Sequence, residues 1–231
     1  MPIKTSLSNS DIEALTSQAN NLRDRLIVSF LWDTGVRVSE LLKVTIGNID
    51  LEKREVLIPH LKRGIHKVCP VCNKQGGRRI AFCSRCGSNL SRVEAVGIEE
   101  RSRIIDIGDD LVIQIKEFLS GEEHNPNEPL IKLTRQGVYE VIRKLSEAAG
   151  LGGKIMLNPE TSRRHFVHPH DFRASLATDG LEMAKNDVSM QKALQSKLGH
   201  KSLDTTSRYN RLTASSIKNF SAELREKRKK K

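Results

Sequence analysis

The sequence of 231 residues predicts an α+β fold that is mainly helical, with a small antiparallel sheet inserted near one third of its length. Three observations lead to this prediction. Most of the chain has apolar residues at helical spacing between polar turns. Short runs rich in Ile, Val and Leu, at 48–50, 54–58 and 103–107, are typical of strands. All four cysteines lie between the last two runs, so a cysteine-rich segment should interrupt the hairpin that these strands form.

The expected helices begin and end at recognisable residues. Ser8 and Asp11 give a capping-box-like S-x-x-D pattern that opens the first helix, Gly35 ends the second, and Thr134 caps a later one. The expected helices span 8–19, 22–32, 38–44, 109–119, 134–149, 170–184, 188–197 and 213–225, with loops at 124–129 and 150–160.

The positive charge of the chain is concentrated in two blocks. The chain has 39 Lys and Arg against 28 Asp and Glu, a net charge of +11. No acidic residue occurs between Glu55 and Glu94, although eight basic residues do, and a basic tail occupies 227–231. The rest of the chain is close to neutral. Such blocks favour a polyanion partner, above all nucleic acid. For the tail alone, a frayed and solvated end explains the charge equally well.

The sequence also excludes several classes of protein. No window approaches the ~18 apolar residues that span a bilayer, and the N-terminus, from Met1 to Lys4, lacks the apolar stretch of a signal peptide. There is no collagen or coiled-coil repeat, and there is enough Leu, Ile and Val to build a core. We therefore expect a soluble, cytoplasmic protein with no membrane partner.

The four cysteines form two C-x-x-C pairs, Cys69 with Cys72 and Cys83 with Cys86. Each pair places two thiolates at one turn, and two such turns give the S₄ cage that Zn²⁺ prefers. A redox site would need a single pair opening a helix, and a disulfide is not expected in a cytosolic chain. Four thiolates leave no open coordination position, so the zinc should be structural. We expect a zinc-ribbon-like hairpin at 66–92, its turns supplied by Gly76, Gly77 and Gly87.

The basic residues around this hairpin are the expected contacts to DNA phosphates, because the −2 charge of a Zn(Cys)₄ centre offsets them only in part. They are Arg63, Lys67, Arg78, Arg79 and Arg85.

Polar residues occur in several further places where local structure does not require them. Arg37 follows a helix-ending glycine within an apolar neighbourhood. His170 and Arg173 lie three apart at a helix start and hence on one face. His200, in Leu-Gly-His, precedes Tyr209 by nine residues. Each residue alone has an ordinary explanation as a surface cation, a helix cap or a core residue.

Taken together, these motifs stand in a recognisable order: Arg, Lys, His-x-x-Arg, Leu-Gly-His and Tyr, with T-G-x-R-x-S-E-L-L around the first Arg. This order resembles the tyrosine recombinase, or phage integrase, family of DNA breaking and joining enzymes. The resemblance covers residues 7–216, apart from the cysteine segment. It implies a tyrosine recombinase catalytic-domain fold and the catalytic residues Arg37, Lys62, His170, Arg173, His200 and Tyr209.

The chemistry of the family explains these residue types. Tyr209 would be the nucleophile, and a phenol with a pKa near 10 needs a base and a positive field to attack a phosphodiester. His170 and His200 would take or share its proton. The donor forks of Arg37 and Arg173 suit the charge that develops on the phosphate oxygens.

The sequence departs from the family pattern in two ways. The catalytic lysine of the family lies in a short hairpin turn, and here the cysteines interrupt that hairpin. Lys62 is the expected catalytic lysine, and Lys67 and then Lys74 are the alternatives. The N-terminal core-binding domain of the family is also missing, so we expect a single catalytic domain over 1–231. It is either part of a longer protein or a compact member whose basic zinc hairpin replaces part of the grip on DNA.

The expected function is therefore site-specific DNA recombination, of integrase or transposase type, through a 3′-phosphotyrosyl link, with structural Zn²⁺ and no catalytic metal or nucleotide cofactor. The expected partner is double-stranded DNA, bound by a chain that is a monomer in solution and a dimer or tetramer on DNA. The apolar residues Ile217, Phe220 and Leu224 would pack on a neighbouring protomer or on the chain's own domain.

Three alternatives stay open. A type IB topoisomerase would share the nucleophile and the arginine pair. A non-catalytic zinc-ribbon DNA-binding protein would use the arginines only to hold phosphate. A metallohydrolase would use the cluster His165, His168, His170 and Asp171 as metal ligands.

Overall fold

The structure is a computed structural model that describes residues 3–4, 6–59, 66–96, 102–121, 123–151, 155–158, 163–184 and 187–199. Within these residues the helices are α1 (Asn9–Ser17), α2 (Leu22–Thr34), α3 (Val38–Leu41), the 3₁₀ helix η1 (Ile46–Asn48), α4 (Asp109–Phe118), α5 (Arg135–Ala148), α6 (Pro169–Met183) and α7 (Val188–Leu198). The strands are β1 (Ile3–Lys4), β2 (Ile49–Asp50), β3 (Glu55–Pro59), β4 (His66–Val68), β5 (Gln75–Gly77), β6 (Ser102–Asp106), β7 (Ile155–Asn158) and β8 (Arg163–His165). The expected helix at 213–225 and the basic tail at 227–231 lie outside the described residues.

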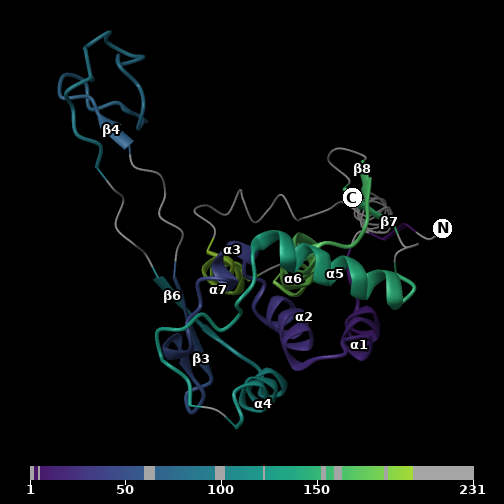
Figure 1. Cartoon of the computed structure of the whole chain (residues 1–231). Helices are drawn as coiled ribbons and strands as arrows, with labels where there is room; N and C mark the ends of the chain where they lie inside the picture. The colour runs from purple at the N-terminus through teal and green to yellow at the C-terminus, as the bar shows by residue number, and fades with distance from the viewer. Residues whose placement is uncertain are drawn as a thin grey trace, which may run out of the picture.

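Helix α2 lies at the centre of the helical body and contacts α1, α4, α5 and α6 (Figure 1). Its apolar residues Leu26, Ile27, Phe30 and Leu31 are fully buried, as the sequence predicts. The helix ends at Gly35, whose left-handed φ of +60° favours glycine and whose N–H donates to Leu31 O at 3.0 Å. This turn leads directly into α3 and fixes where the polar residues after it lie.

The predicted helix caps are confirmed. Ser8 and Asp11 form a capping box, with Ser8 N–H donating to Asp11 Oδ2 at 2.9 Å. The Thr134 side chain accepts from Gly137 N–H at 3.0 Å at the start of α5. Among the described helices, none has both the length and the apolar character needed to cross a membrane.

The predicted antiparallel sheet is also present, in the strand order β2-β3-β6. Strands β3 and β6 pair from Glu55 opposite Asp106 to Pro59 opposite Ser102. Val56 and Ile58 on β3 are fully buried against the body. The cysteine segment therefore leaves and rejoins the body at the ends of this hairpin, as expected.

A second sheet was not predicted, and the expectation of a loop over 150–160 is wrong. Strand β7 lies in this segment, pairs antiparallel with β8 and pairs parallel with β1, with Ile3 opposite Ile155. The apolar run of β7, Ile155 to Leu157, is only three residues long and is flanked by Gly, Asn and Pro, which favour loops. Its partners come from distant parts of the chain, so local patterns do not reveal the pairing.

Residues 66–96, here called the cysteine module, stand apart from the helical body beyond the ends of β3 and β6 (Figure 1). Strands β4 and β5 pair antiparallel within it. Its small core consists of Cys69, Cys83 and Leu90, with other apolar side chains packed around them. The expectation that Gly76 and Gly77 supply turns is wrong, because both lie in β5.

Candidate active site and cysteine cluster

A pocket of about 190 Å³ lies between the turn after α2, the start of α6 and helix α5. It brings Arg37 together with His170 and Arg173, which lie more than 130 positions further along the chain. The other lining residues are Val36, Val38, Ser39, Arg135, Tyr139 and Pro169. Among the described residues that line this pocket, none is acidic. The pocket is therefore suited to an anion such as a phosphate.

Arg173 lies near the start of α6, and only 1% of its surface is exposed. Its Nη1 donates to Gly35 O at 2.7 Å and its Nη2 donates to Leu198 O at 2.5 Å. Gly35 is the C-cap of α2 and Leu198 is the last residue of α7. The C-terminal ends of helices carry partial negative charge, which stabilises a buried guanidinium. Arg173 thus joins three helices at the wall of the pocket.

Arg37 is the N-cap residue of α3, and its side chain is 42% exposed. Its backbone N–H donates to Glu40 Oε2 and its Nη1 donates to Glu40 Oε1, both at 3.0 Å. Glu40 therefore fixes both the backbone and the guanidinium of Arg37. Glu40 lies within the sequence pattern T-G-x-R-x-S-E-L-L, but its role is visible only in the structure.

Glu40 itself is only 1% exposed and is held from a second side by Arg103 on β6. Arg103 Nη2 donates to Glu40 Oε2 at 3.0 Å, and its Nη1 lies 3.4 Å from Oε1. Burial alone would raise the pKa of Glu40, but the hydrogen bonds and charges of Arg103 and Arg37 outweigh it and lower the pKa to about 2. Glu40 is therefore a carboxylate at every pH at which the protein would function.

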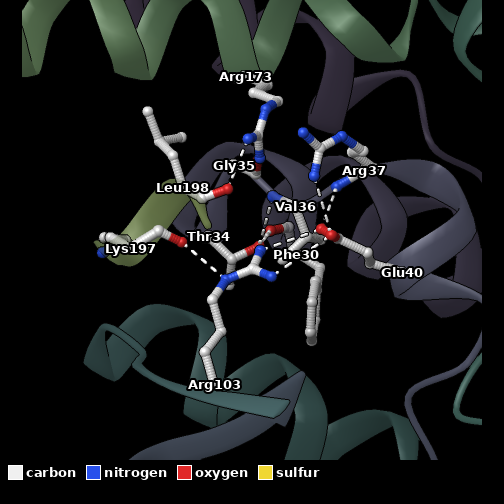
Figure 2. A network of polar contacts seen from close by, with 10 residues as sticks. All are labelled: Phe30, Thr34, Gly35, Val36, Arg37, Glu40, Arg103, Arg173, Lys197 and Leu198. Atoms are coloured by element: carbon white, nitrogen blue, oxygen red, sulfur yellow. Dashed lines mark hydrogen bonds and ion pairs between the residues drawn. The ribbon is translucent and has the colours of Figure 1, made fainter. Parts of the chain in front are cut away.

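The two arginine systems meet at the end of α7. Arg103 Nε donates to Lys197 O at 3.0 Å, next to the Leu198 carbonyl that Arg173 holds. Figure 2 shows Arg173 and Arg103 approaching this end of α7 from opposite sides, with Glu40 between Arg37 and Arg103. The network joins α2, α3, β6, α6 and α7, so it fixes the pocket wall from five elements.

Comparison with known proteins identifies the family of the chain. The chain matches the phage integrase family over residues 5–216. The chain belongs to this family. It is 24% identical over 221 residues to the tyrosine recombinase XerA of Pyrococcus horikoshii, covering 92% of this chain and 59% of that protein. It is 28% identical over 208 residues to XerC of Listeria innocua, covering 90% of this chain and 54% of that protein. The chain thus spans little more than half the length of these relatives.

Solved structures show that the fold is shared. The crystal structure of XerA recombinase matches with a TM-score of 0.60 at 20% identity, over 96% of this chain and 64% of that one. The Tn1549 transposon integrase, solved with transposon right end DNA, matches with a TM-score of 0.56 at 16% identity, over 96% of this chain and 66% of that one. The predicted tyrosine recombinase catalytic-domain fold is therefore confirmed.

The remaining catalytic residues implied by the family fall outside the described part of the chain. These are Lys62, His200 and Tyr209. The described residues nevertheless reach Gly199, where α7 ends with a left-handed φ of +64°. Since Arg173 and Arg103 hold the last turn of α7, they also fix the point from which the chain continues to His200.

The histidine cluster of the metallohydrolase alternative has a structural explanation in α6. The His168 ring accepts from His170 N–H at 3.2 Å, and Asp171 Oδ2 accepts from His168 N–H at 2.9 Å, which together form the N-cap of the helix. The rings of His165 and His168 stack with centroids 4.4 Å apart. Burial lowers the pKa of His168, although the charge of Asp171 opposes this. His170 lines the arginine pocket and is not part of the group His165, His168 and Asp171 that could hold a metal.

The four cysteines come together as predicted. Their sulfur atoms all lie within 4.8 Å of one another, with Cys69 Sγ to Cys86 Sγ and Cys72 Sγ to Cys83 Sγ both at 3.5 Å. None of the four forms a disulfide bond. Tetrahedral zinc with Zn–S bonds of about 2.3 Å requires sulfurs about 3.8 Å apart. The donor set and its spacing fit a structural zinc ion.

The two C-x-x-C turns have the same backbone geometry. In the first, Asn73 N–H donates to Cys69 O at 2.9 Å; in the second, Gly87 N–H donates to Cys83 O at 2.9 Å. Asn73 and Gly87 both have left-handed φ, of +55° and +73°. The sequence predicts Gly87 as a turn residue but not Asn73, although asparagine tolerates this conformation.

The predicted DNA-binding residues of the module differ in their surroundings. Arg78, Arg79 and Arg85 are exposed. Lys67 is half-buried, and its Nζ donates to Leu90 O at 2.6 Å and lies 3.4 Å from Ile80 O. Lys67 therefore ties parts of the module together. Arg63 lies outside the described residues.

Proposed function

We propose that this chain breaks and rejoins DNA strands as a site-specific recombinase of integrase or transposase type. The observation that supports this proposal most strongly is the pocket of Arg37, Arg173 and His170, which has no acidic lining residue among those described and lies beside the end of α7. A scissile phosphate would bind there. Arg37 would donate to a non-bridging oxygen, and the buried charge of Arg173 would stabilise the developing negative charge.

The proposed reaction uses Tyr209 as the nucleophile. Its phenolic oxygen attacks the phosphorus, forms a 3′-phosphotyrosyl bond and expels the 5′-oxygen, which takes a proton from Lys62. His170 and His200 accept or share the tyrosine proton. Rejoining reverses these steps with a 5′-hydroxyl from the same or another strand. The reaction needs no nucleotide, because the phosphotyrosyl bond retains the energy of the broken one.

Covalent capture on randomised DNA tests the proposal without knowledge of the target sequence. The protein is incubated with nicked duplexes that carry a randomised segment, then denatured, and DNA that stays attached to protein is sequenced. We expect attached DNA with the wild type and none with Tyr209→Phe. Tyr139→Phe is the matched control, because Tyr139 is the only other tyrosine and lines the pocket. Adduct from Tyr209→Phe would contradict the assignment.

Assays with the captured DNA sequence then separate a recombinase from a topoisomerase and from a non-catalytic DNA-binding protein. A recombinase joins two duplexes that carry the target, whereas a type IB topoisomerase relaxes supercoiled DNA without exchanging partners. A non-catalytic DNA-binding protein releases all DNA on denaturation.

We further propose that the cysteine module holds one structural zinc ion through Cys69, Cys72, Cys83 and Cys86. The supporting observation is the matched pair of turns that brings the four sulfur atoms together. Bound zinc would lock the two turns to each other, and the exposed Arg78, Arg79 and Arg85 would then contact DNA phosphates. Metal analysis of protein purified without chelator should show one zinc per chain.

The proposed partner is double-stranded DNA, and the related Tn1549 integrase was solved with transposon right end DNA. We propose a monomer in solution that forms a dimer or tetramer on its target, with the segment from Ser216 onward docked on a neighbouring protomer. Light scattering with and without the captured target tests the first part. Deleting residues from Ser216 onward should reduce assembly and cleavage together; full activity of the truncated chain would contradict the docking.

A further inference from the structure

Arg103 occupies an unusual position on β6. Side chains alternate between the two faces of a strand, so Arg103 shares the inward face with Ile105, which is only 2% exposed, while Ile104 on the other face is 62% exposed. The side chain of Arg103 is itself only 9% exposed. A buried charge is costly unless it is paired. The position of Arg103 therefore requires partners that apolar packing does not provide.

The structure provides two partners, on different elements. The guanidinium of Arg103 donates to both oxygens of Glu40 in α3, and its Nε donates to Lys197 O in the last turn of α7. The planar fork of arginine makes both contacts at once, which a lysine ammonium cannot reproduce. The C-terminal end of α7 also attracts a positive charge.

Both partners lead to the candidate active site. Glu40 holds the backbone and the side chain of Arg37, so the position of Arg37 depends on a carboxylate that Arg103 also holds. Lys197 O is adjacent to Leu198 O, the acceptor for Arg173. Figure 2 shows the two arginines holding consecutive carbonyls of α7 from opposite sides.

Arg103 also lies at the base of the interrupted hairpin. It is paired with Ile58 in the register of β3 and β6, and one further pair, Pro59 with Ser102, follows before the described part of the hairpin ends. The chain then continues to Lys62 on one side and to the cysteine module on the other. A displacement of this end of the hairpin would therefore reach Arg103 directly.

We propose that Arg103 is a positioning residue that holds Arg37, through Glu40, and the end of α7 in the arrangement required for DNA cleavage. It acts through these groups and does not contact the reacting phosphate. The proposal rests on the proposed function for its catalytic part, but the two contacts themselves can be tested without DNA.

The variant Arg103→Met removes the charge and the donors while keeping a long side chain. With DNA selected by covalent capture, we expect the rate constant of adduct formation at saturating DNA to fall at least about tenfold, while the Kd for DNA changes less than about threefold. Arg103→Lys, which keeps the charge, should fold even if Arg103→Met does not, and should show an intermediate rate. The matched control is Arg54→Met, because Arg54 pairs with Asp109 at the exposed end of the same hairpin.

A double variant tests the route of the effect. If Arg103 acts on Arg37 through Glu40, then adding Glu40→Gln to Arg103→Met should lower the rate by less than the product of the two single effects. Fully multiplicative effects would contradict that route.

Hydrogen exchange supplies the measurement that does not depend on catalysis. Arg103→Met should speed exchange of the Leu198 and Gly199 amides at the end of α7 by about tenfold or more, and leave α1 and α5 unchanged. Arg54→Met should change neither. Unchanged exchange at α7, equal acceleration throughout the body, or wild-type cleavage by Arg103→Met would each overturn the proposal. Absence of adduct from the wild type would instead refute the proposed function, and the exchange result would still decide the contacts of Arg103.

Discussion

The candidate active site and the cysteine module are both held together by polar groups, but in different ways. In the active site, the buried guanidiniums of Arg103 and Arg173 and the carboxylate of Glu40 sit against a large apolar core and bind one another or the ends of helices. In the module, the core is confined to Cys69, Cys83, Leu90 and a few half-buried neighbours. The candidate active site is thus supported by many elements, whereas the module has only this small core and its cluster of four sulfur atoms.

This difference predicts how the stability of each region responds to the loss of one side-chain group. Removing one group from the arginine network should weaken the body by a few kcal/mol, because the apolar core remains. Removing one sulfur should unfold the module completely, because so small a core cannot offset the conformational entropy of its residues. The following predictions test this contrast.

The largest effect is expected for Cys69→Ser. If the module holds zinc as proposed, this variant should abolish zinc binding and all ordered structure in residues 66–96, because the three remaining thiolates cannot hold the ion alone. Metal analysis and NMR amide shifts measure the two losses. The single tryptophan, Trp32, lies in α2 and reports only on the body. The unfolding transition of the body, followed by Trp32 fluorescence, should not move. Ser84→Ala, in the exposed middle of the second turn, is the control and should retain zinc. A body that unfolds together with the module would contradict the independence of the two regions.

Arg173→Met should have the next largest effect. Two charge-assisted hydrogen bonds are lost and the carbonyls of Gly35 and Leu198 stay buried, so unfolding free energy should fall by about 3–5 kcal/mol. Urea unfolding followed by Trp32 fluorescence measures this. Arg143→Met, which removes an exposed pair with Glu147 on α5, should change it by less than about 0.5 kcal/mol. Equal effects of the two variants would show that the buried network contributes no more than a surface pair.

Glu40→Gln should make stability less dependent on pH. Because the pKa of Glu40 is about 2 in the folded protein and near 4.5 when unfolded, its carboxylate stabilises the fold above pH 4.5, by about 3 kcal/mol. This contribution is lost as the pH falls from about 4.5 to about 2. The difference in unfolding free energy between wild type and Glu40→Gln should therefore be large at pH 6 and shrink at pH 3. A difference that is constant over this range would mean that Glu40 does not titrate with a lowered pKa.

The smallest effects separate two kinds of basic residue in the module. Lys67→Met should destabilise the zinc-bound module by about 1 kcal/mol, because the contact to Leu90 O is lost. Arg79→Met should leave the stability of the module unchanged. It should reduce the slope of log K for DNA binding against log salt concentration by about one. Titrations with a zinc chelator and binding isotherms at several salt concentrations measure these effects. An exchange of roles between the two residues would show that the contacts of Lys67 are unimportant for stability.

Residues with a strong local signature could be predicted from the sequence. The capping box at Ser8, the helix end at Gly35 and the two C-x-x-C turns each depend on a few neighbouring residues, and all lie where expected. The juxtaposition of Arg37 with Arg173 came from the family resemblance and not from local pattern, because it depends on how α6 packs beside α2.

The features that the sequence does not predict depend on contacts between distant elements. The sheet of β1, β7 and β8 joins the N-terminus to residues more than 150 positions away, so short-range alternation could not reveal it. Arg103 did carry a signal, since it falls on the face of β6 that Ile105 makes apolar. That signal marks a buried charge but does not name its partners, Glu40 and Lys197. In the sequence, Lys67 is one of several cations in a basic segment. Its two carbonyl acceptors, Ile80 O and Leu90 O, are visible only in the structure.

The backbone bridge between His66 and Val96 has a consequence for how such a chain could arise. The N–H of each residue donates to the carbonyl of the other, at 3.1 and 2.8 Å, so the two ends of the cysteine module lie side by side. A segment whose ends already meet can be spliced into a hairpin turn without forcing the host strands apart. Because of this geometry, residues 66–96 could be inserted into the turn of an unrelated hairpin. They could also be replaced here by a tight turn, with β3 and β6 keeping their register.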